Sequence, residues 1–197
     1  MGMRKIYLYI LLVFLWSNTG WTEEINNKGT KFSISEISIN DSLLKYFSKK
    51  EIKKNIKNFY KDKKFIVTVL TNERIKESYD YIQIHFKKND KKFKVQSING
   101  TKIMNYDSCL ELQKKIDYEN INKFKDFSRS GPTTRKHAHD KTGESKATSF
   151  FYIFNTGDIA EVSCYFFAEH MGYKGGLTEG ISTAEFHNWL ETKKSEY

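Results

Sequence analysis

One polar segment, residues 129–146, holds the side chains with the clearest capacity for chemistry. His137, His139 and Asp140 combine two imidazoles with a carboxylate, and these ligand types bind zinc and other divalent cations. Basic residues flank them in the sequence: Arg135, Lys136 and Lys141. Because these cations disfavour a metal ion and the segment has no large apolar side chain, we interpret it as a solvent-exposed loop. A metal site, an anion site or a hydrolase that uses this loop is the alternative.

The tripeptide His137-Ala138-His139 resembles the His-x-His start of the metallo-hydrolase signature. In that family an Asp comes two residues after the second His and is itself followed by His. Here Asp140 follows His139 directly, and Lys141 comes next. The resemblance therefore covers the two histidines, and it implies a metal-binding role for them.

Two cysteines, Cys109 and Cys164, are the complete set in the chain. In an oxidising compartment such a pair most simply forms one disulfide. Closing a loop of this length would stabilise the fold by about 4 kcal/mol on the chain-entropy model. Two buried free thiols are the alternative. The spacing is not that of a Cys-x-x-Cys motif, so thiol–disulfide exchange chemistry is not expected.

The N-terminal 22 residues have the pattern of a secretory signal peptide. Arg4 and Lys5 precede an apolar run over residues 6–16, and a polar tail follows. We expect cleavage after Thr22, which places small residues at the required positions. The run is shorter than the roughly 20 apolar residues of a membrane-spanning helix, and no other stretch approaches that length. An uncleaved N-terminal anchor is the alternative to a periplasmic or secreted protein.

The chain is basic, with a formal net charge of +9. Only four of its 33 basic residues are arginines, whereas recognition of phosphates and bases favours the planar guanidinium group. We therefore interpret the lysines first as a solvated surface, and second as a surface for an anionic partner or an envelope protein. Nucleic acid is not an expected partner of an exported protein. No motif predicts a cofactor, and no pair of carboxylates is marked as a general acid and base.

Alternating apolar residues predict strands in three regions. The first is residues 65–70, which are β-branched and apolar. The second is a hairpin in which Asn89-Asp90 turns the chain and pairs Ile84 with Val95; its His85 is expected to face solvent. The third is a hairpin of residues 150–154 and 159–167. A two-residue turn pairs Phe151 with Val162 there, and a glycine-bulge turn shifts this register by one.

Helical spacing predicts short helices over 43–60, one of them beginning with a Ser48–Glu51 capping box. It also predicts a helix over 108–127 and a last helix with an apolar stripe of Phe186, Trp189 and Leu190. The glycine-rich residues 169–181 are expected to be a connection. The expected fold class is α+β, with an antiparallel sheet built from two hairpins and helices packed on one face. We expect a signal peptide, residues 1–22, and a single domain, residues 23–197.

Two further resemblances concern function. Val95 to Ile116 looks like the second half of a PDZ domain, which implies peptide binding. The chain also resembles small uncharacterised exported proteins of AT-rich bacteria, in three stretches: Asp41-Ser42-Leu43-Leu44, His137 to Ser145 and Gly157 to Cys164. That resemblance implies a shared fold and no known activity. We therefore expect a non-enzymatic binding or interaction domain.

Overall fold

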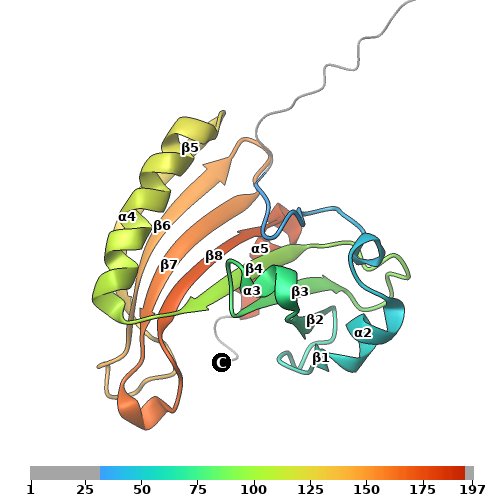
Figure 1. Cartoon of the computed structure of the whole chain (residues 1–197), viewed down its shortest axis with the longest axis horizontal. Coiled ribbons are helices and arrows are strands. Elements are labelled where there is room, and N and C mark those ends of the chain that lie inside the picture. The colour runs from blue at the N-terminus through green and yellow to red at the C-terminus, as the bar shows by residue number, and fades with distance from the viewer. Residues whose placement is uncertain (1–31, 194–197) are drawn as a thin grey trace, which may run out of the picture.

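Eight strands form one antiparallel sheet in the part of the chain that the computed structural model describes, residues 32–193 (Figure 1). The predicted signal peptide and its cleavage after Thr22 lie outside the described residues. In their order across the sheet, the strands are β1 (Ile56–Lys57), β2 (Phe65–Leu70), β3 (Tyr81–Lys87), β4 (Ser97–Ile103), β8 (Gly176–Ser182), β7 (Ile159–Phe166), β6 (Lys146–Phe154) and β5 (Phe127–Lys136).

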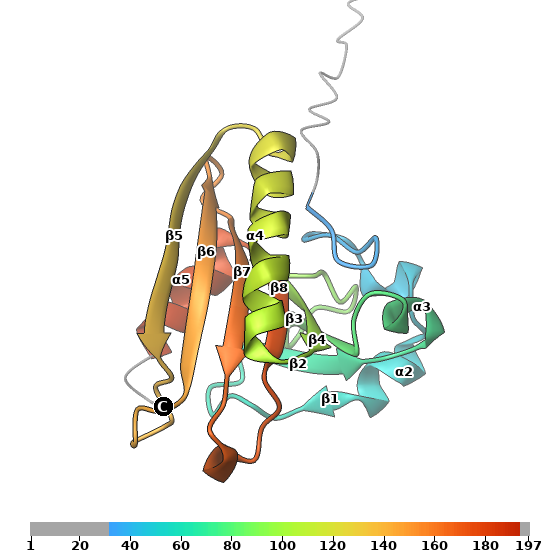
Figure 2. The same ribbon diagram turned by 60° about the vertical axis from the view of Figure 1, so that its left-hand side comes forward.

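Two longer helices lie on opposite sides of this sheet. In Figure 2, α4 (Tyr106–Lys123) stands in front of the strands and α5 (Ala184–Lys193) lies behind them. The shorter elements are the 3-10 helices η1 (Leu43–Lys45) and η2 (Glu169–Met171) and the helices α2 (Lys49–Lys54) and α3 (Glu73–Lys76). None of the described helices is long and apolar enough to cross a membrane.

The two faces of the sheet differ because side chains alternate along each strand. On the face that carries α4, called the α4 face below, Ile84, Ile98 and Val162 are fully buried in the main apolar core. The opposite α5 face has a smaller apolar cluster where α5 covers β2, made of Phe65, Phe186 and Trp189. The predicted apolar stripe of the last helix is confirmed by these contacts.

The expected fold class is wrong. The described chain is predominantly β, its sheet is not built from two hairpins, and its helices do not pack on one face alone. The segments 129–146 and 169–181, expected to be a loop and a connection, contribute β5 and β8. Both lack an apolar alternation: β5 is an edge strand exposed along most of its length, and β8 contains Gly176 and Gly180.

The first predicted hairpin is also wrong, because β3 pairs with residues 97–103 and not with 93–95. Ile84 lies opposite Ile98. The carboxylate of Asp90 accepts hydrogen bonds from the backbone N–H groups of Lys92 and Lys94, at 2.8 Å each. Such a side chain organises a compact turn in place of a continuing strand, so the second strand begins later.

The second predicted hairpin exists as β6 and β7, in the alternative register. Phe150 lies opposite Val162, and Phe151 opposite Glu161, which is the shift by one that a glycine-bulge turn produces. Gly157 has a φ of 81° in that turn. The strand over 65–70 and the capping box of Ser48 and Glu51 are confirmed. The helix over 108–127 begins earlier than expected, with Asn105 as its N-cap residue.

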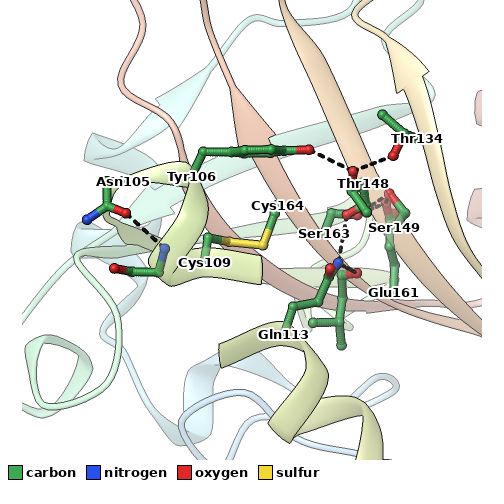
Figure 3. Close-up of a disulfide and its surroundings, with 12 residues drawn as sticks. Asn105, Tyr106, Cys109, Gln113, Thr134, Thr148, Ser149, Glu161, Ser163 and Cys164 are labelled. Carbon is green, nitrogen blue, oxygen red and sulfur yellow. Dashed lines mark hydrogen bonds between the residues drawn. A yellow bond between two sulfur atoms is a disulfide. The ribbon is translucent and has the colours of Figure 1, made fainter. Parts of the chain in front are cut away.

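Helix α4 is fixed to the sheet by a covalent bond and by buried hydrogen bonds (Figure 3). The predicted pairing of Cys109 with Cys164 is present, and it joins α4 to β7. One turn further on, the Gln113 amide nitrogen donates to the backbone carbonyls of Thr148 and Val162, at 2.7 Å each. These contacts fix α4 against the sheet face that it covers.

Candidate functional site

The carboxylate of Asp140 is buried and already has partners. It accepts hydrogen bonds from the backbone N–H groups of Ser145 and Thr142, at 2.7 and 2.9 Å, and from the Thr142 hydroxyl. His170 Nε2 lies 3.0 Å from Oδ1, the carboxylate oxygen that also accepts from Thr142. The hydrogen bonds from Ser145 and Thr142 hold the pKa of Asp140 well below its usual range. Asp140 thus stabilises the turn between β5 and β6.

His137 and His139 lie in the same turn, but the structure does not join them to Asp140 in a metal-binding arrangement. Their ring centroids are 5.6 Å apart, and His137 packs on Phe167 at 5.0 Å. Burial and the neighbouring His139 lower the pKa of His137, so its ring is neutral at pH 7. Within residues 32–193, no group of three or more His, Cys, Asp and Glu side chains is placed to hold a metal ion.

Two neighbouring hollows lie on the α5 face and share Tyr165. The first, about 290 Å³, is called the Glu161 hollow, and the second, about 370 Å³, the amide hollow. Side chains lining the Glu161 hollow include Arg135, Ser149, Phe151, Ile159, Glu161, Tyr165, His187 and Leu190. Side chains lining the amide hollow are Tyr81, Gln83, Asn99, Thr101, His137, Tyr165, Phe167, Lys174 and Thr178.

The amide hollow takes its name from Gln83 and Asn99, which lie directly opposite each other on β3 and β4. Their side-chain amides make no hydrogen bond to any residue of the described range, and both are partly exposed. Asn99 lies across Gly180 on the neighbouring strand. A Cβ at position 180 would overlap Asn99 Oδ1, so only glycine leaves room for the amide there.

Aromatic rings form the other wall of the amide hollow. Tyr165 and Phe167 are nearly parallel, with 7° between their planes and 5.8 Å between their centroids. Burial and the nearby Glu161 carboxylate raise the pKa of Tyr165, which keeps its phenol protonated at neutral pH. The hollow therefore offers neutral donors, neutral acceptors and apolar ring surface, with the exposed Lys174 as its one cationic lining residue.

The Glu161 hollow is organised by two buried serines. Ser149 Oγ and Ser163 Oγ are 2.5 Å apart, and both hydroxyls donate to the Glu161 carboxylate. The two serines thus hold the Glu161 carboxylate in place where it lines the hollow.

Comparisons with protein-family models, curated proteins and solved structures give no match for this chain.

Sequence reasoning missed the amide hollow because its residues come from separate strands. Asn99-Gly100 was the nearest signal, but as a dipeptide it is typical of a turn, and the structure places it inside β4. The alternation of polar residues along 97–101 is the pattern that predicts a polar sheet face. The PDZ-like segment also contains β4, which is paired on both sides, with β3 and β8, and has no free edge.

Proposed function

We propose that this chain is an exported, non-enzymatic binding domain whose ligand occupies the amide hollow. The observation that carries the proposal is the pair of unpartnered amides, Gln83 and Asn99, side by side in a hollow with aromatic walls. Polar side chains in a folded protein usually satisfy their hydrogen bonds with protein or water, and those held ready in a concave site serve to orient a ligand.

The ligand class that fits best is a neutral, hydroxyl-rich molecule such as a saccharide. Each carboxamide supplies both donors and an acceptor, which matches hydroxyl groups that do the same. The apolar faces of Tyr165 and Phe167 suit the C–H surface of a sugar ring. A strongly charged ligand is less well matched, since Lys174 is the single formal charge among the lining side chains when His137 is neutral.

Export is supported by the disulfide between Cys109 and Cys164, because such bonds persist in oxidising compartments. The signal-peptide pattern of residues 1–22 supports the same conclusion. A periplasmic or secreted location follows, with Thr22 as the proposed last residue of the signal.

The alternatives receive less support. A metal site or hydrolase built on His137, His139 and Asp140 would need the Asp140 carboxylate, which Ser145, Thr142 and His170 already engage. Peptide binding in the PDZ manner would need a free strand edge, and β4 has none.

Nuclear magnetic resonance tests the proposal directly, because side-chain amides of Asn and Gln give their own signals. We expect a neutral trisaccharide, maltotriose or the trimer of N-acetylglucosamine, to shift the amide signals of Gln83 and Asn99. Absence of such shifts with both sugars would contradict the proposed ligand class. Shifts with a neutral tripeptide in their place would favour the peptide alternative.

Three variants sharpen this test. Asn99→Ala removes one of the two carboxamides proposed to bind the ligand and is expected to weaken binding at least about tenfold. Gly180→Ala is expected to do the same by displacing the Asn99 amide. Asn58→Ala removes an exposed amide outside both hollows and is the matched control, with unchanged affinity.

A further inference from the structure

The positive charge of the chain is concentrated in one stretch. Residues 45–94 contain 16 basic and six acidic residues, a net charge of +10. The remaining described residues that follow, 95–193, contain 12 basic and 13 acidic residues, a net charge of −1. The sequence therefore divides into a strongly cationic part and a nearly neutral part.

The fold gathers the lysines of this stretch at one end of the sheet. Helix α2 packs on β2, and the backbone N–H of Lys88 donates to the carbonyl of Lys64 at 3.1 Å, which joins the segment after β1 to the loop after β3. Figure 1 shows α2 and β1 at the opposite end of the molecule from α4. We call this surface the lysine end. Its exposed lysines include Lys49, Lys50, Lys53, Lys54, Lys57, Lys61, Lys63, Lys88, Lys91 and Lys92.

Five basic residues of the stretch form ion pairs with acidic residues, and none of these is among the ten lysines named for the lysine end; two of the pairs are Lys45 with Asp41 and Lys76 with Glu73. Lys64 and Lys87 both pair with Glu185 of α5, at 3.5 and 2.6 Å. Arg74 is the single arginine of the stretch, and it pairs with Glu36. Flexible ammonium groups attract any dense array of anions without requiring fixed geometry, whereas a site for one defined phosphate favours arginine. The lysine end thus suits a diffuse anionic surface.

An exposed aromatic residue distinguishes a membrane from a soluble polyanion. Phe59 is 50% exposed, and it stands between Lys57 and Lys61 in the sequence. A phenyl ring among lysines gains nothing from a hydrophilic polymer, but it can enter the boundary between lipid headgroups and acyl chains. We propose that the lysine end binds the surface of an anionic phospholipid bilayer, with the lysines against the headgroups and Phe59 in the interface.

Vesicle co-sedimentation tests this proposal on the processed chain, residues 23–197, with its disulfide intact. Binding is expected to vesicles of phosphatidylglycerol and phosphatidylcholine in equal parts, and not to phosphatidylcholine alone. Raising the salt from about 0.1 M to about 1 M shortens the screening length from about 10 Å to about 3 Å and should release the protein.

Matched variants separate the lysine end from total charge. The triple change Lys53→Gln, Lys57→Gln and Lys61→Gln should weaken vesicle binding about 100-fold, since each lysine near an anionic bilayer contributes about a fivefold change. The control Lys102→Gln, Lys115→Gln and Lys125→Gln removes the same charge from exposed sites outside the lysine end, and should change binding less than about fivefold. Equal losses in both variants would overturn the proposal.

Phe59 decides between a bilayer and a soluble polyanion. Phe59→Trp should show a blue-shifted emission when anionic vesicles are added and no shift with soluble polyphosphate. An unshifted emission on vesicles, or polyphosphate binding as tight as vesicle binding, would overturn the bilayer assignment. The saccharide-induced shifts of the Gln83 and Asn99 amide signals should be the same in the lysine variants and in the unchanged chain. Vesicle binding at the lysine end is thereby tested independently of the proposed ligand site.

Discussion

The strands β1 to β4 and the strands β5 to β8 share one sheet, but different interactions hold the helices on the two halves. In the first half, apolar side chains make the contacts: Leu43, Ile52 and Ile75 are fully buried, one from each short helix. In the second half, the buried positions of α4 are Cys109, Gln113, Asp117 and Asn120, three of which are polar. A disulfide and specific hydrogen bonds therefore replace part of the apolar packing there.

The stability of the two halves therefore depends on different conditions. Apolar burial is non-directional and is unaffected by reductant, whereas buried polar groups must keep their partners because an unpaired one is costly. Removing the disulfide, which joins α4 to β7, or the ion pair of Asp117 with Arg129, which joins α4 to β5, should loosen α4 and leave α2 on β2 in place.

Removing the disulfide should have the largest effect on the second half. In the double variant Cys109→Ala and Cys164→Ala, we expect the free energy of unfolding to fall by about 4 kcal/mol, because the closed loop of the denatured chain is lost. Urea denaturation measures the loss, and hydrogen exchange locates it. Exchange should accelerate in α4 more than in α2. A loss below about 1 kcal/mol, with α4 still protected, would show that hydrogen bonds alone fix the helix.

Breaking the partly exposed ion pair of α4 should come next. Asp117 accepts hydrogen bonds from Arg129 Nε and Nη2, at 2.7 and 2.6 Å, and from the Tyr152 hydroxyl at 2.8 Å. Asp117→Ala leaves the buried Tyr152 hydroxyl without its acceptor, while the exposed Arg129 can be hydrated, and should cost about 2 kcal/mol. Glu111→Ala, an exposed change on the same helix, is the control and should stay within about 0.5 kcal/mol. Equal effects of the two variants in urea denaturation would contradict the polar anchoring of α4.

The same contrast explains how much of the fold could be predicted from the sequence. The strand over 65–70 and the stripe of Phe186 and Trp189 follow apolar periodicity, and they were predicted. The strands β5 and β8 were not, because an exposed edge strand and a strand with two glycines carry no apolar alternation. Where polar contacts take the place of burial, the sequence pattern loses its strongest signal.

The candidate site was hidden for a related reason. Gln83, Asn99 and Tyr165 meet only through the pairing order of the strands, which no local pattern encodes. His137 and His139 were predicted as candidate ligands from residue type alone, whereas His170, which is distant in the sequence, contacts the Asp140 carboxylate. His85 was expected to face solvent, but α5 covers it, because Phe186 packs on its ring at 4.7 Å.

Acid should act on the first half through His85. Burial lowers the pKa of His85 to about 3, against about 6.5 in the unfolded chain. The unfolded state therefore binds more protons between these values, and stability falls as the pH falls. From pH 7 to pH 5 the loss should be about 2 kcal/mol. Asp140, whose pKa is lowered by its hydrogen bonds, contributes stability that is lost only as the pH falls further, below about 4.

The variant His85→Phe isolates this term, because the difference between the two proteins cancels every other titrating group. We expect its free energy of unfolding, measured in urea at pH 7, 6 and 5, to decline less steeply than that of the unchanged chain. His187→Gln, on the partly exposed side of α5, is the control. Parallel curves for all three proteins would mean that His85 does not couple the α5 cluster to acid.

The smallest effects concern the first residues of one helix in each half. Ser48 Oγ accepts from the Glu51 N–H at 3.2 Å, and Asn105 Oδ1 accepts from the Ser108 N–H at 2.9 Å. Ser48→Ala and Asn105→Ala should each cost about 1 kcal/mol, and the corresponding glycine variants only a few tenths, because glycine exposes the helix end to water. If the two halves unfold together, both alanine variants lower the midpoint of one common transition in urea. If Ser48→Ala instead accelerates hydrogen exchange in α2 and leaves that midpoint unchanged, α2 opens separately, and the covalently closed half is the more stable of the two.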